Sequence, residues 1–133
     1  MIDIHTHILP MVDDGFQSVN ESLLMLERAY QDGTDEMVLT PHLAYSYDFI
    51  NPYRKIKELF NEFQEIVQDE GIPIKLYLGC EFLFTSTASF YKHLEDITRI
   101  NQTQYLLIEF FFDVQEDLVL EAIDIVIENH YIP

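Results

Sequence analysis

The sequence predicts an α/β protein with a parallel sheet, and two patterns support this. Short apolar segments alternate with longer segments in which apolar residues recur at helical spacing. Prolines, glycines and helix-capping residues stand at the boundaries between the two kinds of segment. Such βαβ alternation is typical of parallel strands joined by helical crossovers. We therefore expect functional side chains to gather where the strands end.

The apolar segments predict strands over residues 1–4, 37–40, 74–79 and 105–110. Helical patterns predict helices bounded by residues 18 and 33, 51 and 71, 85 and 94, and 115 and 129. The first helix begins at a capping box made by Ser18 and Glu21, and the second begins with Asn51 as N-cap before Pro52. Residues 130–133 have the character of a fifth strand that is just beginning.

The composition limits the classes of function. The chain has 133 residues, of which 24 are Asp or Glu and 7 are Lys or Arg, so its formal net charge is −17. This charge argues against a nucleic-acid partner or an anionic membrane surface, because both require basic protein surface. With 48% apolar residues the chain can bury a core, and we expect one domain over residues 1–133.

The cysteine content and the lengths of the apolar runs predict the compartment in which the protein is located. A lone cysteine, Cys80, cannot form an internal disulfide, which favours a reducing compartment. The charged N-terminus lacks the apolar core of a signal peptide, and no apolar run is long enough to span a bilayer. We therefore expect a cytoplasmic protein without membrane insertion.

Two histidines follow the first predicted strand in a pattern typical of a metal site. His5 and His7 are two residues apart, and side chains with this spacing point to the same side of an extended segment. Both imidazoles can therefore reach one ion. Asp3 shares their parity, so it is a candidate to orient one imidazole from behind.

Each remaining strand also delivers a possible ligand. His42 follows the second strand, Glu81 follows the third, and Glu109 lies near the end of the fourth. Asp14 lies in the loop after the two histidines. An unpaired carboxylate at the end of an apolar strand would be costly, which favours metal binding. We predict six metal ligands: His5, His7, Asp14, His42, Glu81 and Glu109.

Imidazoles and carboxylates without thiolates suit Mn, Fe or Zn, and a mixed set of this size suits a multinuclear site. Such ions lower the pKa of bound water and neutralise the charge of a phosphate ester. With a net charge of −17, the protein needs bound metal to attract phosphate at all.

Simpler interpretations remain open for several residues. His42 could cap the helix that follows it, and Asp14 could be only a turn former beside Gly15. His93 and His130 are expected to be solvated or to interact with a helix C-terminus.

Cys80 is interpreted as a structural residue. A cysteine phosphatase needs a phosphate-binding loop that is closed by an arginine about six residues after the cysteine. Residues 81–86 contain neither arginine nor glycine.

Five motifs occur in order: MIDIHTHILP at residues 1–10, DDG at 13–15 with ES at 21–22, TPH at 40–42, GCE at 79–81 and LIEF at 107–110. Together they resemble the bacterial manganese-dependent protein-tyrosine phosphatases. These enzymes belong to the PHP (polymerase and histidinol phosphatase) superfamily and regulate capsule and exopolysaccharide synthesis.

The resemblance implies a PHP-type distorted (β/α) barrel with metals at the strand ends. Here it covers about half of such a barrel, βαβαβ(α)β plus a final helix, so the chain resembles a truncated PHP domain. Matching positions imply that the six residues named above hold up to three Mn²⁺ ions, with Fe or Zn as alternatives. Glu81 is then the best candidate to bridge two ions.

The resemblance also implies a reaction and a partner. Family members hydrolyse phosphotyrosine with a metal-bound hydroxide, often on the tyrosine-rich tail of a bacterial tyrosine kinase. This chain departs from the family after His42, where residues 43–47 are LAYSY in place of the usual basic residues. Phosphate contacts from this loop are therefore not expected.

Three other functions stay open at this point. One is another PHP phosphoesterase, such as a histidinol phosphatase, and one is an amidohydrolase-type metal enzyme, although the TPH motif favours the PHP interpretation. The third is an inactive half-domain that only binds or oligomerises. Half a barrel leaves strand edges and an apolar sheet face uncovered, so we expect self-association.

Overall fold

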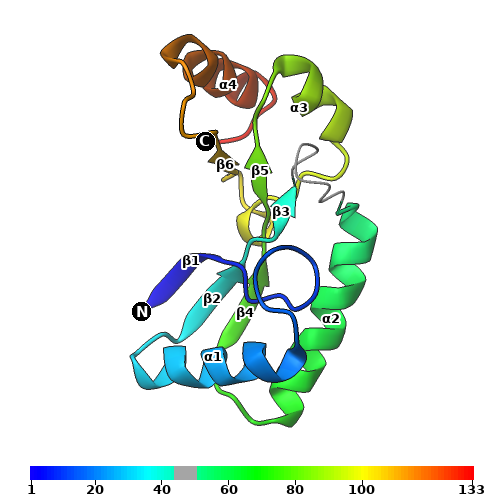
Figure 1. Cartoon of the computed structure of the whole chain (residues 1–133), viewed down its shortest axis with the longest axis vertical. Helices are drawn as coiled ribbons and strands as arrows, with labels where there is room; N and C mark the ends of the chain where they lie inside the picture. The colour runs from blue at the N-terminus through cyan, green and yellow to red at the C-terminus, as the bar shows by residue number, and fades with distance from the viewer. Residues whose placement is uncertain (44–50) are drawn as a thin grey trace.

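The computed structural model describes residues 1–43 and 51–133. These residues form two parallel three-stranded sheets (Figure 1). The first sheet has the order β1-β2-β4, with β1 at Ile2–Thr6, β2 at Glu36–Leu39 and β4 at Lys75–Leu78. The second has the order β3-β5-β6, with β3 at His42–Leu43, β5 at Glu81–Leu83 and β6 at Leu107–Glu109. The predicted parallel α/β class is confirmed.

The helices divide between the two sheets. Helices α1 (Val19–Gln31) and α2 (Tyr53–Asp69) lie with β1, β2 and β4 at the lower end of Figure 1. Helices α3 (Thr87–His93) and α4 (Glu116–Glu128) lie with β3, β5 and β6 at the upper end. We call these two groups of elements the first module and the second module. A short 3-10 helix, η2 (Ile100–Gln102), lies beside β4.

Two of the predicted strands continue beyond their expected ends after a break. Pro41 has no N–H to donate, so it interrupts the ladder between β2 and β3. Gly79 interrupts β4 and β5 where the strands are crowded, because a Cβ there would lie 3.3 Å from Thr40 Cγ2. Hydrogen bonds cross both breaks: the N–H of Gly79 donates to Leu39 O at 2.9 Å and that of Glu81 to Pro41 O at 3.1 Å. The strands therefore pass from one module into the other.

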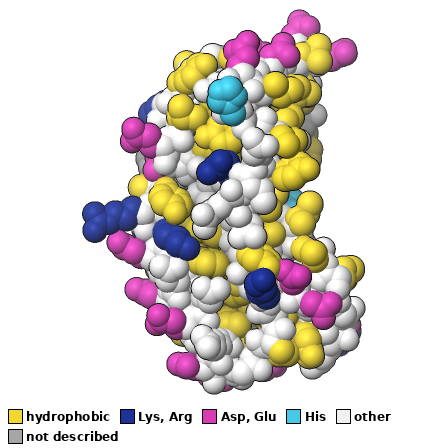
Figure 2. Space-filling view, turned by 180° about the vertical axis from the view of Figure 1, so that it is seen from behind, with side chains coloured by type: hydrophobic (Ala, Val, Ile, Leu, Met, Phe, Trp, Pro, Cys, Tyr) yellow, Lys and Arg dark blue, Asp and Glu magenta, His cyan; other side chains and the backbone are white. Residues whose placement is uncertain are grey.

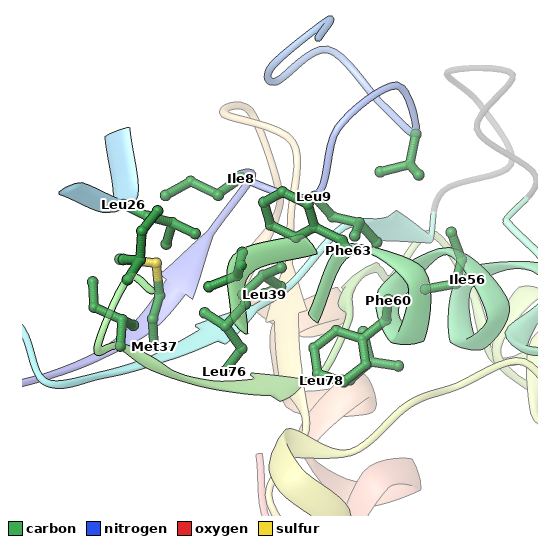
Figure 3. Packing of buried hydrophobic residues seen from close by; sticks show 14 residues of the cluster. Ile8, Leu9, Leu26, Met37, Leu39, Ile56, Phe60, Phe63, Leu76 and Leu78 are labelled. Carbon is green, nitrogen blue, oxygen red and sulfur yellow. The ribbon is translucent and has the colours of Figure 1, made fainter. Parts of the chain in front are cut away.

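The core of the first module is mainly aliphatic. Leu26 of α1 and Phe63 of α2 are almost fully buried against Met37 and Leu39 of β2 (Figure 3). Helix α1 begins as predicted, because the Ser18 side chain accepts from the N–H of Glu21 at 3.3 Å. Tyr30 lies in the last turn of α1 and is 44% exposed.

The core of the second module is aromatic. Phe82 and Phe84 of the β5 segment surround Phe90 of α3, with ring centroids 5.9 and 6.5 Å from it. Ala122 and Val126 of α4 close the cluster and are fully buried. The Phe82–Phe90 pair is edge-to-face, and such packing adds to the free energy gained by burying each ring.

Asn51 does not cap α2 as predicted. Its buried side-chain amide donates to Val12 O at 3.2 Å and to His42 O at 2.8 Å, which ties the first loop to β3. The N–H of Tyr53 at the start of α2 instead donates to Asp96 at 3.0 Å. A residue 43 positions away takes over the capping role, which local spacing could not reveal.

Two further expectations are modified by the structure. The fifth strand is present only as an isolated parallel bridge between Tyr105 and Ile132. Within residues 1–43 and 51–133, no helix is both long and apolar enough to cross a membrane.

Candidate metal centre

The six predicted ligands meet at the seam between the two modules, and each module supplies three of them. The first module supplies His5 within β1, His7 just after it, and Asp14 in the following loop. The second module supplies His42, Glu81 and Glu109. We predicted that His42 and Glu81 follow the ends of two strands. They instead begin β3 and β5, because strand pairing resumes after Pro41 and Gly79. Within the described residues, the next helix after His42 is α2, and its N-cap residue is Pro52.

Glu81 lies at the centre of this cluster. Its Oε1 lies 3.0 Å from His5 Nε2, and its Oε2 lies 3.2 Å from both His7 Nε2 and His42 Nδ1. The Glu81 side chain is only 10% exposed. One carboxylate thus contacts all three imidazoles, and its two oxygens point toward different donors.

Asp14 and Glu109 contact His42 from opposite sides of its ring. Asp14 Oδ1 lies 3.5 Å from His42 Nε2, and Glu109 Oε2 lies 3.3 Å from His42 Nδ1. The same Glu109 oxygen is buried and accepts no hydrogen bond from the described residues. A buried carboxylate oxygen in that state is suited to a cation.

Three overlapping groups of donors fit metal ions. They are His5, His7 and Glu81; His7, Asp14 and His42; and His42, Glu81 and Glu109, each with donor atoms within 4.8 Å of one another. Ligands that bind one ion at about 2.0–2.2 Å lie at most about 4.4 Å apart, so small side-chain adjustments suffice. Neighbouring groups share His7, His42 or Glu81, which is the arrangement that a multinuclear site requires.

Asp13 is the functional residue that the sequence interpretation missed. Its buried carboxylate accepts from His7 Nδ1 at 2.9 Å, from the N–H of His42 at 3.0 Å and from that of Gly15 at 3.0 Å. It therefore orients one candidate ligand and anchors a second. Asp3, which we expected in this role, accepts only from the backbone N–H of His5 among the described residues.

Gly15 makes the position of Asp13 possible. A Cβ at residue 15 would lie 2.2 Å from the carbonyl oxygen of His7 and 2.7 Å from its Cβ. The loop can fold back over His7 only where no side chain intervenes. The adjacent Asp-Asp-Gly turn was the available signal, but it does not reveal which aspartate points inward.

The electrostatics of the site follow from these contacts. The hydrogen bond to Asp13, reinforced by that to Glu81, raises the pKa of His7 from 6.5 to about 10. Burial by itself would raise the pKa of Asp13, but the hydrogen bonds from His7, His42 and Gly15 outweigh it and lower that pKa.

The two glutamates are shifted in opposite directions. Burial opposes ionisation of Glu81, but His7 and the nearby His5 and His42 lower its pKa overall. Burial and the neighbouring charge of Glu81 raise the pKa of Glu109. In the absence of metal, the site therefore holds one firmly ionised carboxylate beside one that keeps its proton more readily.

The other residues singled out in the sequence lie outside this cluster. Burial raises the pKa of the Cys80 thiol to about 12, and its Sγ accepts from the N–H of Thr98 at 3.2 Å, which agrees with a structural role. His130 is exposed after α4. His93 is only 6% exposed and so is not solvated, but it lies in the last turn of α3, which agrees with the alternative expectation of a position at a helix C-terminus. Residues 44–47, which replace the basic residues after His42, lie outside the described residues.

A parallel α/β fold with imidazoles and carboxylates at such a seam defines a candidate metal-binding protein. The chain belongs to the capsular polysaccharide synthesis family CpsB/CapC, whose family model matches residues 1–133. The predicted resemblance to bacterial PHP-type tyrosine phosphatases is thereby confirmed at the level of the family.

Individual relatives agree with this assignment. CapC of Staphylococcus aureus is 36% identical over 110 residues, which cover 83% of this chain and 43% of CapC. The tyrosine-protein phosphatase CpsB of Streptococcus pneumoniae is also 36% identical, over 83% of this chain and 45% of CpsB.

A solved structure is also similar to the fold. It comes from the crystal structures of YwqE from Bacillus subtilis and CpsB from Streptococcus pneumoniae, described as unique metal-dependent tyrosine phosphatases. The match has a TM-score of 0.88 at 28% identity and covers all of this chain but 53% of the other. The chain thus spans about half the length of the proteins it matches.

Proposed function

We propose that this chain is part of a metal-dependent phosphohydrolase that removes phosphate from tyrosine in proteins and thereby regulates capsular or exopolysaccharide synthesis. The observation that carries the proposal is the cluster of three imidazoles and three carboxylates around Glu81. The substrate class rests on relatives that are named tyrosine-protein phosphatases.

We propose Mn²⁺ as the metal, with up to three ions held by His5, His7, Asp14, His42, Glu81 and Glu109. The donor set contains no thiolate, which suits Mn, Fe or Zn. Bound ions of this type activate water as a nucleophile and neutralise the charge of the phosphate ester.

The side chains of the protein prepare the site for these ions. Asp13 accepts a hydrogen bond from Nδ1 of His7. Nε2 of His7, which faces Glu81, is then the nitrogen that would bind metal. Glu81 contributes its two oxygens to different donor groups and therefore couples the two modules. Glu109 adds a second carboxylate, whose buried Oε2 lies 3.3 Å from the same His42 nitrogen that Glu81 contacts.

The direct test is turnover by this 133-residue chain. A phosphotyrosine peptide is incubated with the protein and Mn²⁺, with a chelator-treated sample as control. We expect phosphate release that the chelator abolishes. Release of phosphate from histidinol phosphate but not from the peptide would show that the substrate is not phosphotyrosine. Release that does not need metal would overturn the proposal.

Variants separate the proposed site from the rest of the surface. His5→Ala and Glu81→Gln each remove a donor and should abolish turnover, whereas His130→Asn and Glu95→Gln change exposed residues of the same types and should not. Equal loss in all four variants would mean that the site is wrongly assigned. Binding without turnover in the unsubstituted chain would indicate an inactive half-domain.

We further propose a partner and a location by resemblance. The partner is a protein with phosphotyrosine in a tyrosine-rich tail, as in a bacterial tyrosine kinase. The compartment is the cytoplasm, where the buried Cys80 stays a free thiol.

Self-association of this chain is also proposed. Strand β1 is an edge strand of the first sheet, and its Ile2 and Ile4 are 59% and 56% exposed. Leu120 and Ile127 of α4 are similarly exposed in the second module. Light scattering should therefore detect dimers or larger species, and a monomer at all concentrations would contradict this.

A further inference from the structure

A groove runs along α2 on the side of β4 that faces away from β2, and η2 lies beside the C-terminal end of β4 there. Two cavities of about 560 and about 300 Å³ share Gln64, Lys75 and Leu76 and so form one continuous depression. Helix α2 forms one wall and β4 forms the floor. At the far end, Arg99 and Gln102 also border a third cavity of about 150 Å³, which Glu95 lines as well. We call this depression the α2–β4 groove.

The charge of this groove is opposite to that of the protein. Lys57, Lys75 and Arg99 line it, which are three of the seven cations in a chain with a net charge of −17. No carboxylate of the described residues lines the cavity of about 300 Å³, and Glu65 lines that of about 560 Å³. In Figure 2, Lys and Arg side chains lie across the middle of the molecule, whereas Asp and Glu lie mainly along its margins.

The three cations are available to a ligand. Arg28 and Arg54 each pair with a carboxylate one helical turn away at 3.1 Å, but no ion pair within 4.0 Å joins Lys57, Lys75 or Arg99 to a carboxylate of the described chain. Lys57 Nζ lies 5.0 Å from the centroid of Phe60, and Lys75 Nζ lies 5.0 Å from that of Tyr77. These rings line the same cavity and hold the ammonium groups over it.

One nearby carboxylate, that of Glu36, does not cancel this charge. It lies on β2 rather than in the groove, and it accepts the hydroxyl hydrogen of Tyr77. Glu36 keeps its negative charge and lies opposite Lys75 in the β2–β4 register, so it reduces the attraction of Lys75 for an external anion, and Lys57 and Arg99 supply more of the complementary charge.

The main chain of β4 also presents hydrogen-bonding groups to the groove. The N–H of Lys75 donates to Asp35 O and that of Gly79 to Leu39 O, so the odd-numbered residues face β2. Main-chain groups alternate sides along a strand, and Leu76 therefore faces the groove. Among the described residues, its carbonyl oxygen accepts only from the Gln64 amide, at 3.5 Å, which is a long and weak contact.

We propose that the α2–β4 groove binds an extended, acidic peptide segment of a partner protein. The carboxylates of that segment pair with Lys57, Lys75 and Arg99, and its main chain hydrogen-bonds to Leu76 beside β4. Addition of a strand to a free sheet edge gives affinity through the main chain, while complementary charge gives specificity. This function is independent of the metal centre.

The test uses a fluorescein-labelled peptide of alternating Glu and Val, with a Gln-for-Glu peptide as its neutral counterpart, in fluorescence anisotropy. We expect the acidic peptide to bind, the neutral one to bind at least about tenfold more weakly, and added salt to reduce the difference. Lys75→Glu and Arg99→Glu should each weaken binding several-fold. Arg28→Glu is the matched control, since it makes the same charge change on α1, and it should leave affinity nearly unchanged.

A second measurement tests the geometry. The amide resonances of residues 75–78 should shift on titration with the acidic peptide, and a peptide with methylated backbone nitrogens should not produce the shift. Phosphatase turnover should be unaffected by Lys75→Glu, which also shows that the variant is folded.

Several outcomes would overturn the proposal. Absence of binding by the acidic peptide, or equal weakening by Arg28→Glu, would show that the groove is not specific. Full competition by inorganic phosphate would indicate a small-anion site instead. Concentration-dependent self-association that Lys75→Glu abolishes would show that a second copy of the chain occupies the groove.

Discussion

Each module buries a hydrophobic core against a parallel three-stranded sheet, but the two cores differ in their residues. In the described part of the first module, fourteen buried apolar residues, mostly aliphatic, pack between a three-stranded sheet and two long helices. In the second, a smaller cluster of eight buried residues relies on the rings of Phe82, Phe84 and Phe90. The first module is therefore stabilised mainly by its own burial, and the second depends more on a few large side chains and on its connections across the seam.

The largest expected effect comes from Phe90, at the centre of the second module. Phe90→Ala should lower the free energy of unfolding by about 3–5 kcal/mol, because a fully buried ring is removed and a cavity is left. Leu26→Ala, at an equally buried position of the first module, should cost about 2–5 kcal/mol. Urea unfolding followed by circular dichroism measures both.

The same experiment tests whether the modules are one unit. Since β2 continues into β3 and β4 into β5, we expect one transition in both variants, with equal midpoints by different probes. Leu120→Ala, at a position of α4 that is 52% exposed, is the control and should change little. Two separate transitions in Phe90→Ala would show that the modules fold independently.

A second prediction concerns the side chain that joins the modules. Glu81→Gln should weaken Mn²⁺ binding by more than about 100-fold, since loss of an outer partner alone typically costs about 10–100-fold and Glu81 serves two donor groups. Calorimetric titration of Mn²⁺ into both proteins measures this, with Glu95→Gln as the control. Unchanged stoichiometry and affinity in Glu81→Gln would remove Glu81 from the site.

The sequence predicted the helices and strands better than it predicted the break between the two sheets. Helix boundaries were accurate within a few residues because caps and glycines are local signals, as at Ser18 and Gly33. The division into two sheets was not predicted, because Pro41 and Gly79 resemble strand ends in sequence and only the neighbouring strands show that pairing resumes.

The candidate site shows the same limit. Residue type and position after a strand selected six candidate donors, and the structure brings all six together. The role of Asp13 depends on a loop that closes over His7, and the burial of His93 depends on how α3 packs in the second module. Both are consequences of tertiary contacts that spacing along the chain does not encode.

A third prediction concerns how the first module holds His7. Asp13→Asn should weaken Mn²⁺ binding by about 10–100-fold, because the amide no longer fixes the imidazole with its Nδ1 proton toward the loop. Asp35→Asn, an exposed aspartate in the same module, is the control. A loss as large as that of Glu81→Gln would instead indicate that Asp13 binds metal directly.

The pH dependence of unfolding for metal-free protein sharpens this prediction. The pKa of His7 is raised from 6.5 to about 10, so its contribution to stability is complete below 6.5 and is lost as the pH rises through about 10. The pKa of Asp13 is lowered from 3.8, so its contribution is present above 3.8 and is lost as the pH falls further. Asp13→Asn should therefore cost most between 3.8 and 6.5. A cost independent of pH would exclude the ion pair.

The smallest effect concerns how the helices of the two modules begin. Helix α1 has a side-chain cap from Ser18, whereas the N-cap residue of α4, Gln115, makes no such bond. Ser18→Ala should cost about 1 kcal/mol, and Gln115→Ser should stabilise by a similar or smaller amount, because its backbone is already extended as a cap requires. Thermal unfolding of both variants measures this, with Asn20→Ala inside α1 as a control for helix propensity. Stabilisation by Gln115→Ser without a matching cost for Ser18→Ala would mean that the second module, not the first, limits the stability of the whole chain.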